Sequence, residues 1–499
     1  MAYVLGIDNG LTVSKAVVFD AAGRPVATAR RRVAQSMPAA HFVERDMETL
    51  WRETAGAIRE ALELACIAPG EIAAVAATAH GDGLYLVDAQ ARPLRPGILS
   101  LDSRAGPIVD RWTADGTAAR ALARTGQMPH ASAPSAILAW IKAHEPQVFA
   151  RIGTILAAKD WIRYCLTGTL GTDLTEASTS FTDVTIQAYA DDIPGIFGLD
   201  ALGSALPEVA PPDACVGQVH EAAAAMTGLT AGTPVVAGVH DVTASALGVG
   251  GYAPGTVAIV AGTYSINETI SERPKTDPGW FCRNGIALGE WNNMAISPAS
   301  AANYDWFLDT LMAAERQADG DALHDQIAKD VASVGQSNVL FHPYLFGAPH
   351  GPVASASFIG LRGWQGRAEM LRALIEGIAF NHRVHVDALR GAFDIKEARL
   401  TGGISRNPVF NQVFADALGL PVGVTGTEEA AAWGAALCAG SGVGLFETPR
   451  HDPRELEVTP YAPDPARAGD MDALYALHCE TSDALRPVWA KLARRGSGE

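Results

Sequence analysis

The chain has 499 residues, of which 48% are hydrophobic, and its formal net charge is −17. This length predicts at least two domains, because one hydrophobic core rarely extends over so many residues. The acidic balance argues against nucleic acid or an anionic membrane surface as a partner.

The six cysteines are scattered and form no C-x-x-C motif, so neither a zinc site nor a disulfide framework is indicated. Their pattern is typical of reduced cysteines, and we expect a cytoplasmic protein. No uncharged apolar stretch approaches ~18 residues and no signal-peptide pattern occurs, so no membrane partner is expected.

The first predicted element is a strand over residues 4–7, which ends at Asp8 and is followed by Asn9-Gly10. Asn-Gly between two apolar runs predicts a tight hairpin with positive φ at both turn residues, and residues 13–19 would form the returning strand. Two interpretations of Asp8 stay open. It is an ordinary polar strand end, or it is a carboxylate aimed at a metal ion beside an anion-binding turn.

A helix follows from Met47, with Asp46 as its N-cap, and Pro69-Gly70 would stop it. The apolar run from residue 72 to residue 78 predicts a buried strand. The order of strand, hairpin, helix and strand indicates the start of an α/β layer.

A second carboxylate follows a strand later in the chain. Residues 235–239 predict a short buried strand, His240-Asp241 lies at its end, and a helix starts at Val242. Ligands of open α/β sheets bind at the carboxyl ends of the strands. Asp241 is therefore a candidate functional residue.

A hairpin pattern then recurs. Residues 257–266 predict a strand, a turn at Gly262-Thr263 and a returning strand, which repeats the arrangement around Asp8. Two similar hairpins indicate two related α/β halves, with a boundary near residues 248–254. We therefore expect one domain over residues 1–250 and another over residues 251–499.

A glycine pair, Gly402-Gly403, follows a strand and precedes a helix that opens at about Pro408. Such a turn either joins the two elements tightly or offers its amides to an anion. No Walker A motif occurs. A helix of mostly small residues over 428–436 predicts very close packing against a neighbour.

These features together supply the parts of a phosphotransferase. Phosphoryl transfer needs backbone amides for phosphate, a carboxylate-held Mg²⁺ and a base for the hydroxyl proton. In this combination the sequence resembles the FGGY carbohydrate kinases of the actin/hexokinase-like ATPase superfamily, from about Val4 to about Phe446. The motifs that carry the resemblance are GIDNG from Gly6, ERDMETLW from Glu44, KDWIRYCLTG from Lys159, GVHDV from Gly238, AGT from Ala261, TGGISRNP from Thr401 and AAWGAA from Ala431.

The resemblance implies an α/β fold of two actin-like (ribonuclease H-like) ATPase domains with a hinge and an interdomain cleft. The domain 1–250 would lie on the sugar side and the domain 251–499 on the nucleotide side. ATP and Mg²⁺ would be the cofactors. The resemblance also allows a homodimer.

The resemblance also assigns residues. Asp241 matches the catalytic base, which contacts the sugar, and Asp8 and Asp241 match the metal site. The positions that match the ATP site are Asp8, Gly10, Thr12, Lys15, Gly262, Thr263, Gly402, Gly403 and Asn407. The positions that match substrate loops are His80, Asp82, Asp102 and Arg104. For His80 a backbone-bonded loop histidine stays an alternative, and for Arg104 a salt bridge to Asp102.

The function that the resemblance implies is ATP-dependent phosphorylation of a hydroxyl of a small neutral sugar. The loops at residues 81–84 and 98–105 look most like the L-xylulose and pentulose kinase branch. A ketopentose such as L-xylulose is therefore the first candidate. The alternatives are a polyol such as erythritol, xylitol or glycerol and, after these, a non-kinase actin-like ATPase. The carboxylate of Asp82 would accept bonds from hydroxyls and repel an anionic sugar acid.

Overall fold

The structure is a computed structural model that describes residues 2–320, 322–348, 353–454 and 456–496. The chain forms two compact units. Unit 1 consists of Met1–Tyr252, Ile270–Asn293 and Thr427–Leu456, and unit 2 consists of Ala253–Thr269, Met294–Gly426 and Glu457–Glu499. In the described ranges, no helix is both long and apolar enough to cross a membrane.

Unit 1 is built on a six-stranded sheet with the strand order β13-β14-β5-β1-β2-β3. β1 pairs antiparallel with β2 and parallel with β5, and β5 pairs parallel with β14. The carboxyl ends of β1, β5 and β14 therefore share one edge of the sheet. The strand bounds are β1 Tyr3–Asn9, β2 Val13–Asp20, β3 Pro25–Arg32, β5 Ile72–Ala79, β13 Cys215–Gln218 and β14 Pro234–Val236.

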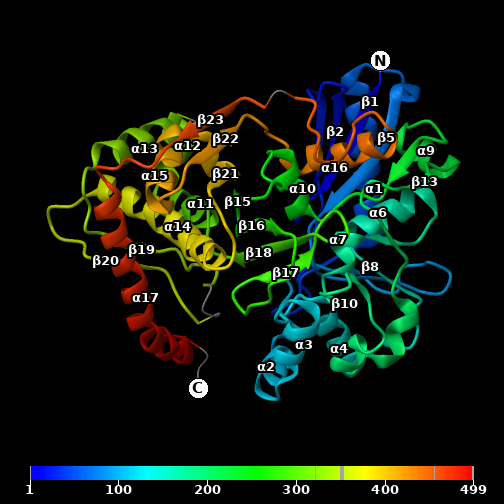
Figure 1. Ribbon diagram of the computed structural model, residues 1–499, viewed down its shortest axis with the longest axis horizontal. Helices are drawn as coiled ribbons and strands as arrows, with labels where there is room; N and C mark the ends of the chain where they lie inside the picture. The colour runs from blue at the N-terminus through cyan, green and yellow to red at the C-terminus, as the bar shows by residue number, and fades with distance from the viewer. Residues whose placement is uncertain (1, 321, 349–352, 455, 497–499) are drawn as a thin grey trace. The chain divides into compact units, whose positions relative to one another are not determined.

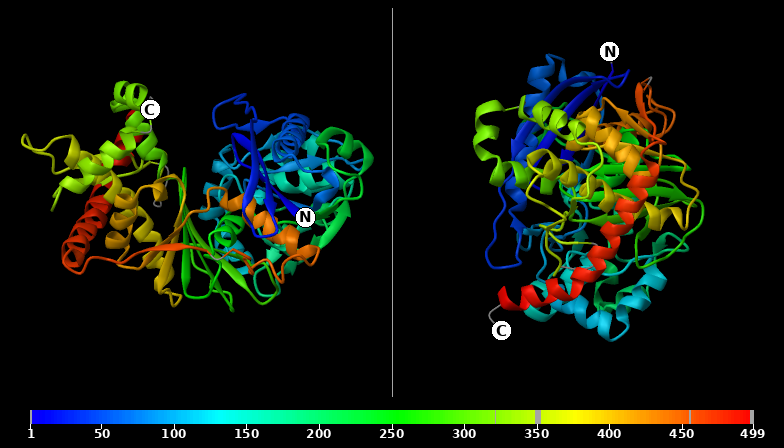
Figure 2. Two further views of the ribbon diagram at one scale, coloured as in Figure 1. Left: turned by 90° about the horizontal axis from the view of Figure 1, so that it is seen from above. Right: turned by 90° about the vertical axis from the view of Figure 1, so that its left-hand side faces the viewer.

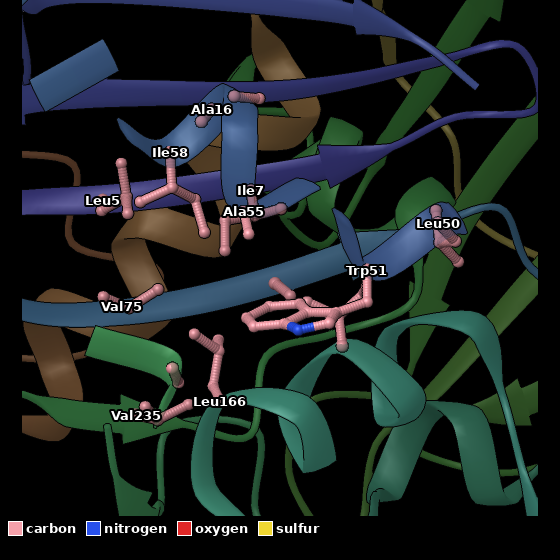
Figure 3. Packing of buried hydrophobic residues seen from close by; sticks show 14 of the residues in the cluster. Leu5, Ile7, Ala16, Leu50, Trp51, Ala55, Ile58, Val75, Leu166 and Val235 are labelled. Carbon is pink, nitrogen blue, oxygen red and sulfur yellow. The ribbon is translucent and has the colours of Figure 1, made fainter. Parts of the chain in front are cut away.

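One face of this sheet is covered by helix α1 (Met47–Ala65), and Asp46 caps the helix as predicted by accepting a bond from Thr49 N. Figure 3 shows Ile58 of the helix beside Leu5 of β1, and Trp51 belongs to the same buried cluster. Burying an apolar side chain of this size contributes about 1.5–3 kcal/mol. This packing holds β1, and with it the segment around Asp8, against a rigid helix.

Within unit 1, helices α10 (Asp241–Gly248) and α16 (Ala430–Gly442) pack against each other at very short range. A Cβ atom at Gly434 would lie 2.0 Å from Ala244 O. A Cβ atom at Gly6 of β1 would lie 2.0 Å from Ala432 O. The predicted close packing of the small-residue helix is thus confirmed. Figure 1 shows α16, in orange, beside the blue strands from the start of the chain.

A second large sheet has the strand order β17-β18-β16-β15-β21-β22-β23. β15 pairs antiparallel with β16 and parallel with β21, β21 pairs parallel with β22, and β22 pairs antiparallel with β23. These directions repeat those of the first sheet, in agreement with two related α/β halves. The bounds are β15 Thr256–Ala261, β16 Ser265–Ser271, β17 Phe281–Asn284, β18 Trp291–Ser297, β21 Glu397–Thr401, β22 Val422–Thr425 and β23 Val458–Tyr461.

Several helices of unit 2 pack against one another. These helices include α14 (Arg367–Arg390), α15 (Pro408–Leu418) and α17 (Ala468–Gly496). α17 packs against both of the others, and Figure 2 shows it in red beside their yellow and orange ribbons. The N-terminus of α15 follows the predicted glycine turn and is capped by Asn407, whose side chain accepts a bond from Val409 N.

The first hairpin differs from its prediction in one respect. Neither Asn9 nor Gly10 has a positive φ. β1 continues through Asn9, and Gly10 N donates to Val13 O at 3.0 Å, so the connection is longer than two residues. The Asn9 side chain is buried and accepts bonds from the hydroxyls of Ser14 and Thr54. The prediction of a two-residue turn was wrong because these buried partners hold Asn9 in the strand.

Candidate active site

Asp8 lies at the carboxyl end of β1 and is paired across the hairpin with Lys15 of β2. The Lys15 ammonium lies 3.4 Å from Asp8 Oδ2 and 3.0 Å from Glu429 Oε2. Burial raises the pKa of Asp8, and the Lys15 charge opposes that rise. Glu429, at the start of α16, also pairs with Arg30. Lys15 is thus shared between two carboxylates and neutralises neither completely.

Asp241 is the first residue of α10, and its Oδ1 atom accepts a bond from Val242 N at 2.8 Å. Its side chain is 32% exposed, so a ligand can reach it. Burial of the site and the charge of Asp8 raise the pKa of Asp241 to about 7. A carboxylate with such a pKa can accept a proton near neutral pH, which is what a general base requires.

Asp82 forms the centre of a second charged group, although its φ of 57° is unusual for a residue with a Cβ atom. Arg283 of β17 donates to Asp82 Oδ1 at 2.8 Å, and His130 Nε2 lies 3.7 Å from Asp82 Oδ2. Arg283 also lies 3.2 Å from His240 Nε2 and donates to Gln127 Oε1 at 3.0 Å. Burial would raise the pKa of Asp82, but the Arg283 charge lowers it overall. Asp82 is therefore ionised and paired.

His80 lies directly after β5 with its Nε2 atom 3.2 Å from the hydroxyl of Tyr85. Its backbone N–H donates to Asn9 O at 2.9 Å, which joins it to the end of β1. Burial and the Arg45 charge lower the pKa of His80 to about 3. The imidazole is therefore neutral at physiological pH.

Asp102 and Arg104 form a buried ion pair with an Nη2–Oδ2 distance of 2.7 Å. Arg104 also pairs with Glu44 at 2.7 Å, and Asp102 Oδ2 accepts a bond from Val43 N at 2.7 Å. Both side chains are fully buried. The structure thus shows the salt bridge that the sequence left open as the alternative, and both residues hold their loop in place.

The turn between β1 and β2 is held by its own backbone. Gly10 N is bonded within the turn, and Val33 N donates to Thr12 O at 2.9 Å. Arg45 donates to Gly10 O at 3.3 Å and also to Leu11 O. The carbonyl groups of Gly10 and Leu11 are therefore directed towards Arg45.

Unit 2 carries the remaining predicted positions. Gly262 and Thr263 connect β15 to β16, and Gly262 O accepts a bond from Ala301 N at 2.8 Å. Gly402 has a φ of 100°, and a Cβ atom there would lie 2.4 Å from Ala261 O. Only glycine fits this position, so the glycine turn and the end of β15 lie in direct contact.

A cavity of about 460 Å³ lies in unit 2 beside this glycine turn. Gly403 and Asn407 line it together with the aromatic rings of Tyr304 and Phe410, and its charged side chains include Asp325 and Arg406. Small-molecule sites commonly have this size and mix of aromatic and polar groups. The predicted residues therefore fit a nucleoside. In unit 1, Asp8 and Asp241 supply the carboxylate oxygens that Mg²⁺ prefers.

The structure adds residues that the sequence did not single out. Arg283 and Glu429 are the main examples, since they contact Asp82 and Lys15 from distant parts of the chain. The only local signal was the acidic pair Glu428-Glu429 before the small-residue helix. No pattern around Arg283 indicated its partner.

Comparison with known proteins places the chain in one family. The profile of the FGGY family of carbohydrate kinases, N-terminal domain, matches residues 3–248, and that of the C-terminal domain matches residues 257–443. The chain is 33% identical over 495 residues to a probable L-xylulose kinase of Pasteurella multocida, covering 98% of this chain and 100% of that protein. It is 31% identical over 518 residues to an erythritol kinase of Brucella abortus, covering 98% of each.

The fold agrees with this placement. The xylulose kinase of Rhodospirillum rubrum has a solved structure that matches with a TM-score of 0.85 at 28% identity, covering 98% of this chain and 100% of that one. The predicted fold class of two α/β kinase domains and the predicted enzyme class are confirmed. The chain belongs to the FGGY family of carbohydrate kinases, the ATP-dependent sugar kinases that its motifs resemble.

Proposed function

We propose that this kinase transfers the γ-phosphate of ATP to a hydroxyl of a ketopentose, with L-xylulose as the first candidate. The observation that carries the proposal is Asp241, a reachable carboxylate with a pKa raised to about 7 beside Asp8. The similarity to a probable L-xylulose kinase supports this choice of sugar. The similarity to an erythritol kinase supports a linear polyol as the second candidate.

In this proposal Asp241 accepts the proton of the attacking hydroxyl. The sugar oxygen forms a bond to the γ-phosphorus, the bond from that phosphorus to the bridging oxygen breaks, and ADP leaves. Asp8 and Asp241 would hold Mg²⁺, which supplies positive charge to the phosphates. Asp82 and neutral His80 would contact sugar hydroxyls, whereas Asp102 and Arg104 would support their loop.

We assign the ATP contacts to Gly10, Thr12, Lys15, Gly262, Thr263, Gly402, Gly403 and Asn407. The domain 1–250 would supply the base and the sugar contacts, and the domain 251–499 the nucleoside pocket. A cytoplasmic location, where ATP is available, and a homodimer stay predictions.

The test is ADP release with Mg-ATP across a panel of neutral substrates. The panel contains L-xylulose, D-xylulose, L-ribulose, D-ribulose, erythritol, xylitol and glycerol. We expect one ketopentose to exceed the rest in kcat/KM by ~100-fold, a difference of roughly 2.7 kcal/mol in transition-state binding. If a polyol has the highest kcat/KM instead, that polyol becomes the proposed substrate. ATP hydrolysis that no panel member accelerates would contradict the proposal.

A further inference from the structure

The motif KDWIRYCLTG and the Thr-Asp pair after it contribute no residue to the candidate active site. Lys159 of the motif lies in helix α6 (Ala158–Thr167), and Asp173 ends the short strand β9 (Thr172–Asp173). Both side chains are fully buried. A buried lysine is costly unless its charge is paired, so its partners indicate what it does.

The Lys159 ammonium uses each of its donors. It lies 2.8 Å from Asp173 Oδ1 and 2.9 Å from Asp160 Oδ1, and it donates to Ala237 O at 3.4 Å. Burial alone would lower the pKa of Lys159, but Asp160 and Asp173 raise it above its ordinary value. The lysine therefore stays charged, and one of its bonds reaches the segment that leads to Asp241.

Asp173 continues the connection through Thr175, which lies in the short helix α7 (Leu174–Ala177). The Thr175 hydroxyl donates to Asp173 Oδ2 at 2.6 Å and accepts a bond from the backbone N–H of His240 at 2.9 Å. A hydroxyl that donates to a carboxylate becomes a better acceptor. The chain of bonds thus ends on the peptide next to Asp241.

The segment between β14 and α10 is held at other points as well. Thr78 of β5 donates to Val239 O at 2.7 Å. Gly238 has a φ of 76°, and a Cβ atom there would lie 2.1 Å from Ala77 O. Residues 237–240 are therefore fixed by bonds to Ala237 O, Val239 O and His240 N, together with a backbone contact that only glycine allows.

We propose that Lys159, Asp173 and Thr175 are positioning residues for this kinase, which hold the backbone of His240 so that the Asp241 carboxylate meets the sugar hydroxyl. None of the three needs to touch substrate. The inference rests on the proposed function, because these residues are proposed to position Asp241, the base of that reaction. It gives the Lys-Asp and Thr-Asp motifs a catalytic purpose beyond packing.

The test compares two substitutions at Thr175. Thr175→Val keeps the shape of the side chain but removes both bonds, whereas Thr175→Ser keeps the hydroxyl. Because a misplacement of about 1 Å can cost about 100-fold, we expect Thr175→Val to lower kcat about 10- to 100-fold. The KM for ATP should not change, and Thr175→Ser should retain most of the wild-type kcat.

Thr227→Val is the matched control. Thr227 is a fully buried threonine of α9 (Glu221–Thr227) whose hydroxyl donates to Ala223 O at 2.8 Å and accepts from Leu229 N at 3.2 Å. Its hydroxyl likewise donates one bond and accepts one, but both partners are backbone groups outside residues 237–240. We expect a comparable loss of melting temperature and an unchanged kcat. If Thr227→Val lowers kcat as much as Thr175→Val, the effect is general destabilisation and the proposal fails.

The role of Asp173 is tested by a double-mutant cycle. If Thr175 acts through Asp173, Asp173→Asn combined with Thr175→Val should lower kcat no further than the more damaging single variant. Independent, multiplying effects would show that Asp173 does not act through Thr175 and would remove that step from the proposal.

Hydrogen exchange of the peptide that contains the His240 amide gives a readout that needs no substrate. We expect faster exchange at that amide in Thr175→Val than in wild type. Wild-type protein with no sugar-dependent turnover would contradict the proposed function, and the exchange experiment would still test the chain of bonds. Unchanged exchange, or wild-type kcat in Thr175→Val, would overturn the positioning role.

Discussion

Arg283 Nη2 lies 2.8 Å from Asp82 Oδ1, and the two side chains form an ion pair in unit 1. The Arg283 side chain is only 3% exposed. Asp82 is therefore not an isolated carboxylate, and the pair as a whole is neutral. A neutral pair offers hydroxyl groups both acceptors and donors, which agrees with a neutral sugar or polyol as substrate.

Asp82→Asn should shift selectivity towards an acidic sugar. The change leaves the Arg283 guanidinium without its carboxylate, and a hydrogen bond to a charged group contributes about 1.5–3 kcal/mol. We expect the ratio of kcat/KM for a sugar acid over its neutral ketose to rise about 10- to 100-fold. The measurement is ADP release with the two substrates in parallel.

Asp183→Asn is the control for that experiment. It removes the carboxylate of another Arg–Asp pair in unit 1, where Arg124 lies 3.0 Å from Asp183. Its selectivity should equal that of wild type. An unchanged ratio in Asp82→Asn would show that Arg283 does not face the substrate.

The rate should depend on pH through Asp241. A general base acts when ionised, and burial and Asp8 raise the pKa of Asp241 to about 7. The profile of kcat/KM reports the free enzyme, so it should fall about tenfold per pH unit below that value. Asp82 also raises this pKa. Asp82→Asn should therefore move the acid limb to lower pH, and a shift to higher pH would contradict the assignment.

Gly434→Ala should destabilise unit 1. The new Cβ atom would lie 2.0 Å from Ala244 O of α10, so the two helices would have to separate. Overpacking of this kind costs about 1–3 kcal/mol in the free energy of unfolding. Chemical denaturation measures the change. Gly469→Ala in α17 is the control, because its Cβ atom would meet nothing within 4 Å, and it should be neutral or stabilising by up to about 1 kcal/mol. An equal loss in the free energy of unfolding for Gly434→Ala and Gly469→Ala would contradict the role of this close contact.

Features that depend on neighbouring residues were predictable from the sequence. Asp46 caps α1, and Gly168 ends α6 with a φ of 73°, because a cap needs only a few adjacent residues. The carboxylates Asp8 and Asp241 were identified from the strands that precede them. In contrast, Arg283 is separated from Asp82 by 201 residues. Tertiary packing determines which residue pairs with a buried charge, and a local sequence pattern does not indicate that partner.

The positions of the turns were harder to predict than their existence. Asn-Gly predicted a hairpin at the correct place but the wrong turn, because the buried bonds from Ser14 and Thr54 keep Asn9 in β1. For Arg104 the sequence left a salt bridge to Asp102 open beside a substrate contact, and the structure shows that salt bridge. Thr54, from elsewhere in unit 1, helped to decide the first case, whereas the salt bridge joins residues two positions apart.

The most direct test of the account is sugar-dependent ADP formation by Asp241→Asn beside wild type, at saturating Mg-ATP. The substitution keeps the size of the side chain and removes the proton acceptor, whose loss typically costs about 100- to 10,000-fold. We predict a loss of this size in kcat while the protein stays folded and still binds ATP. A folded Asp241→Asn protein with wild-type turnover would contradict the assignment of Asp241 as the base.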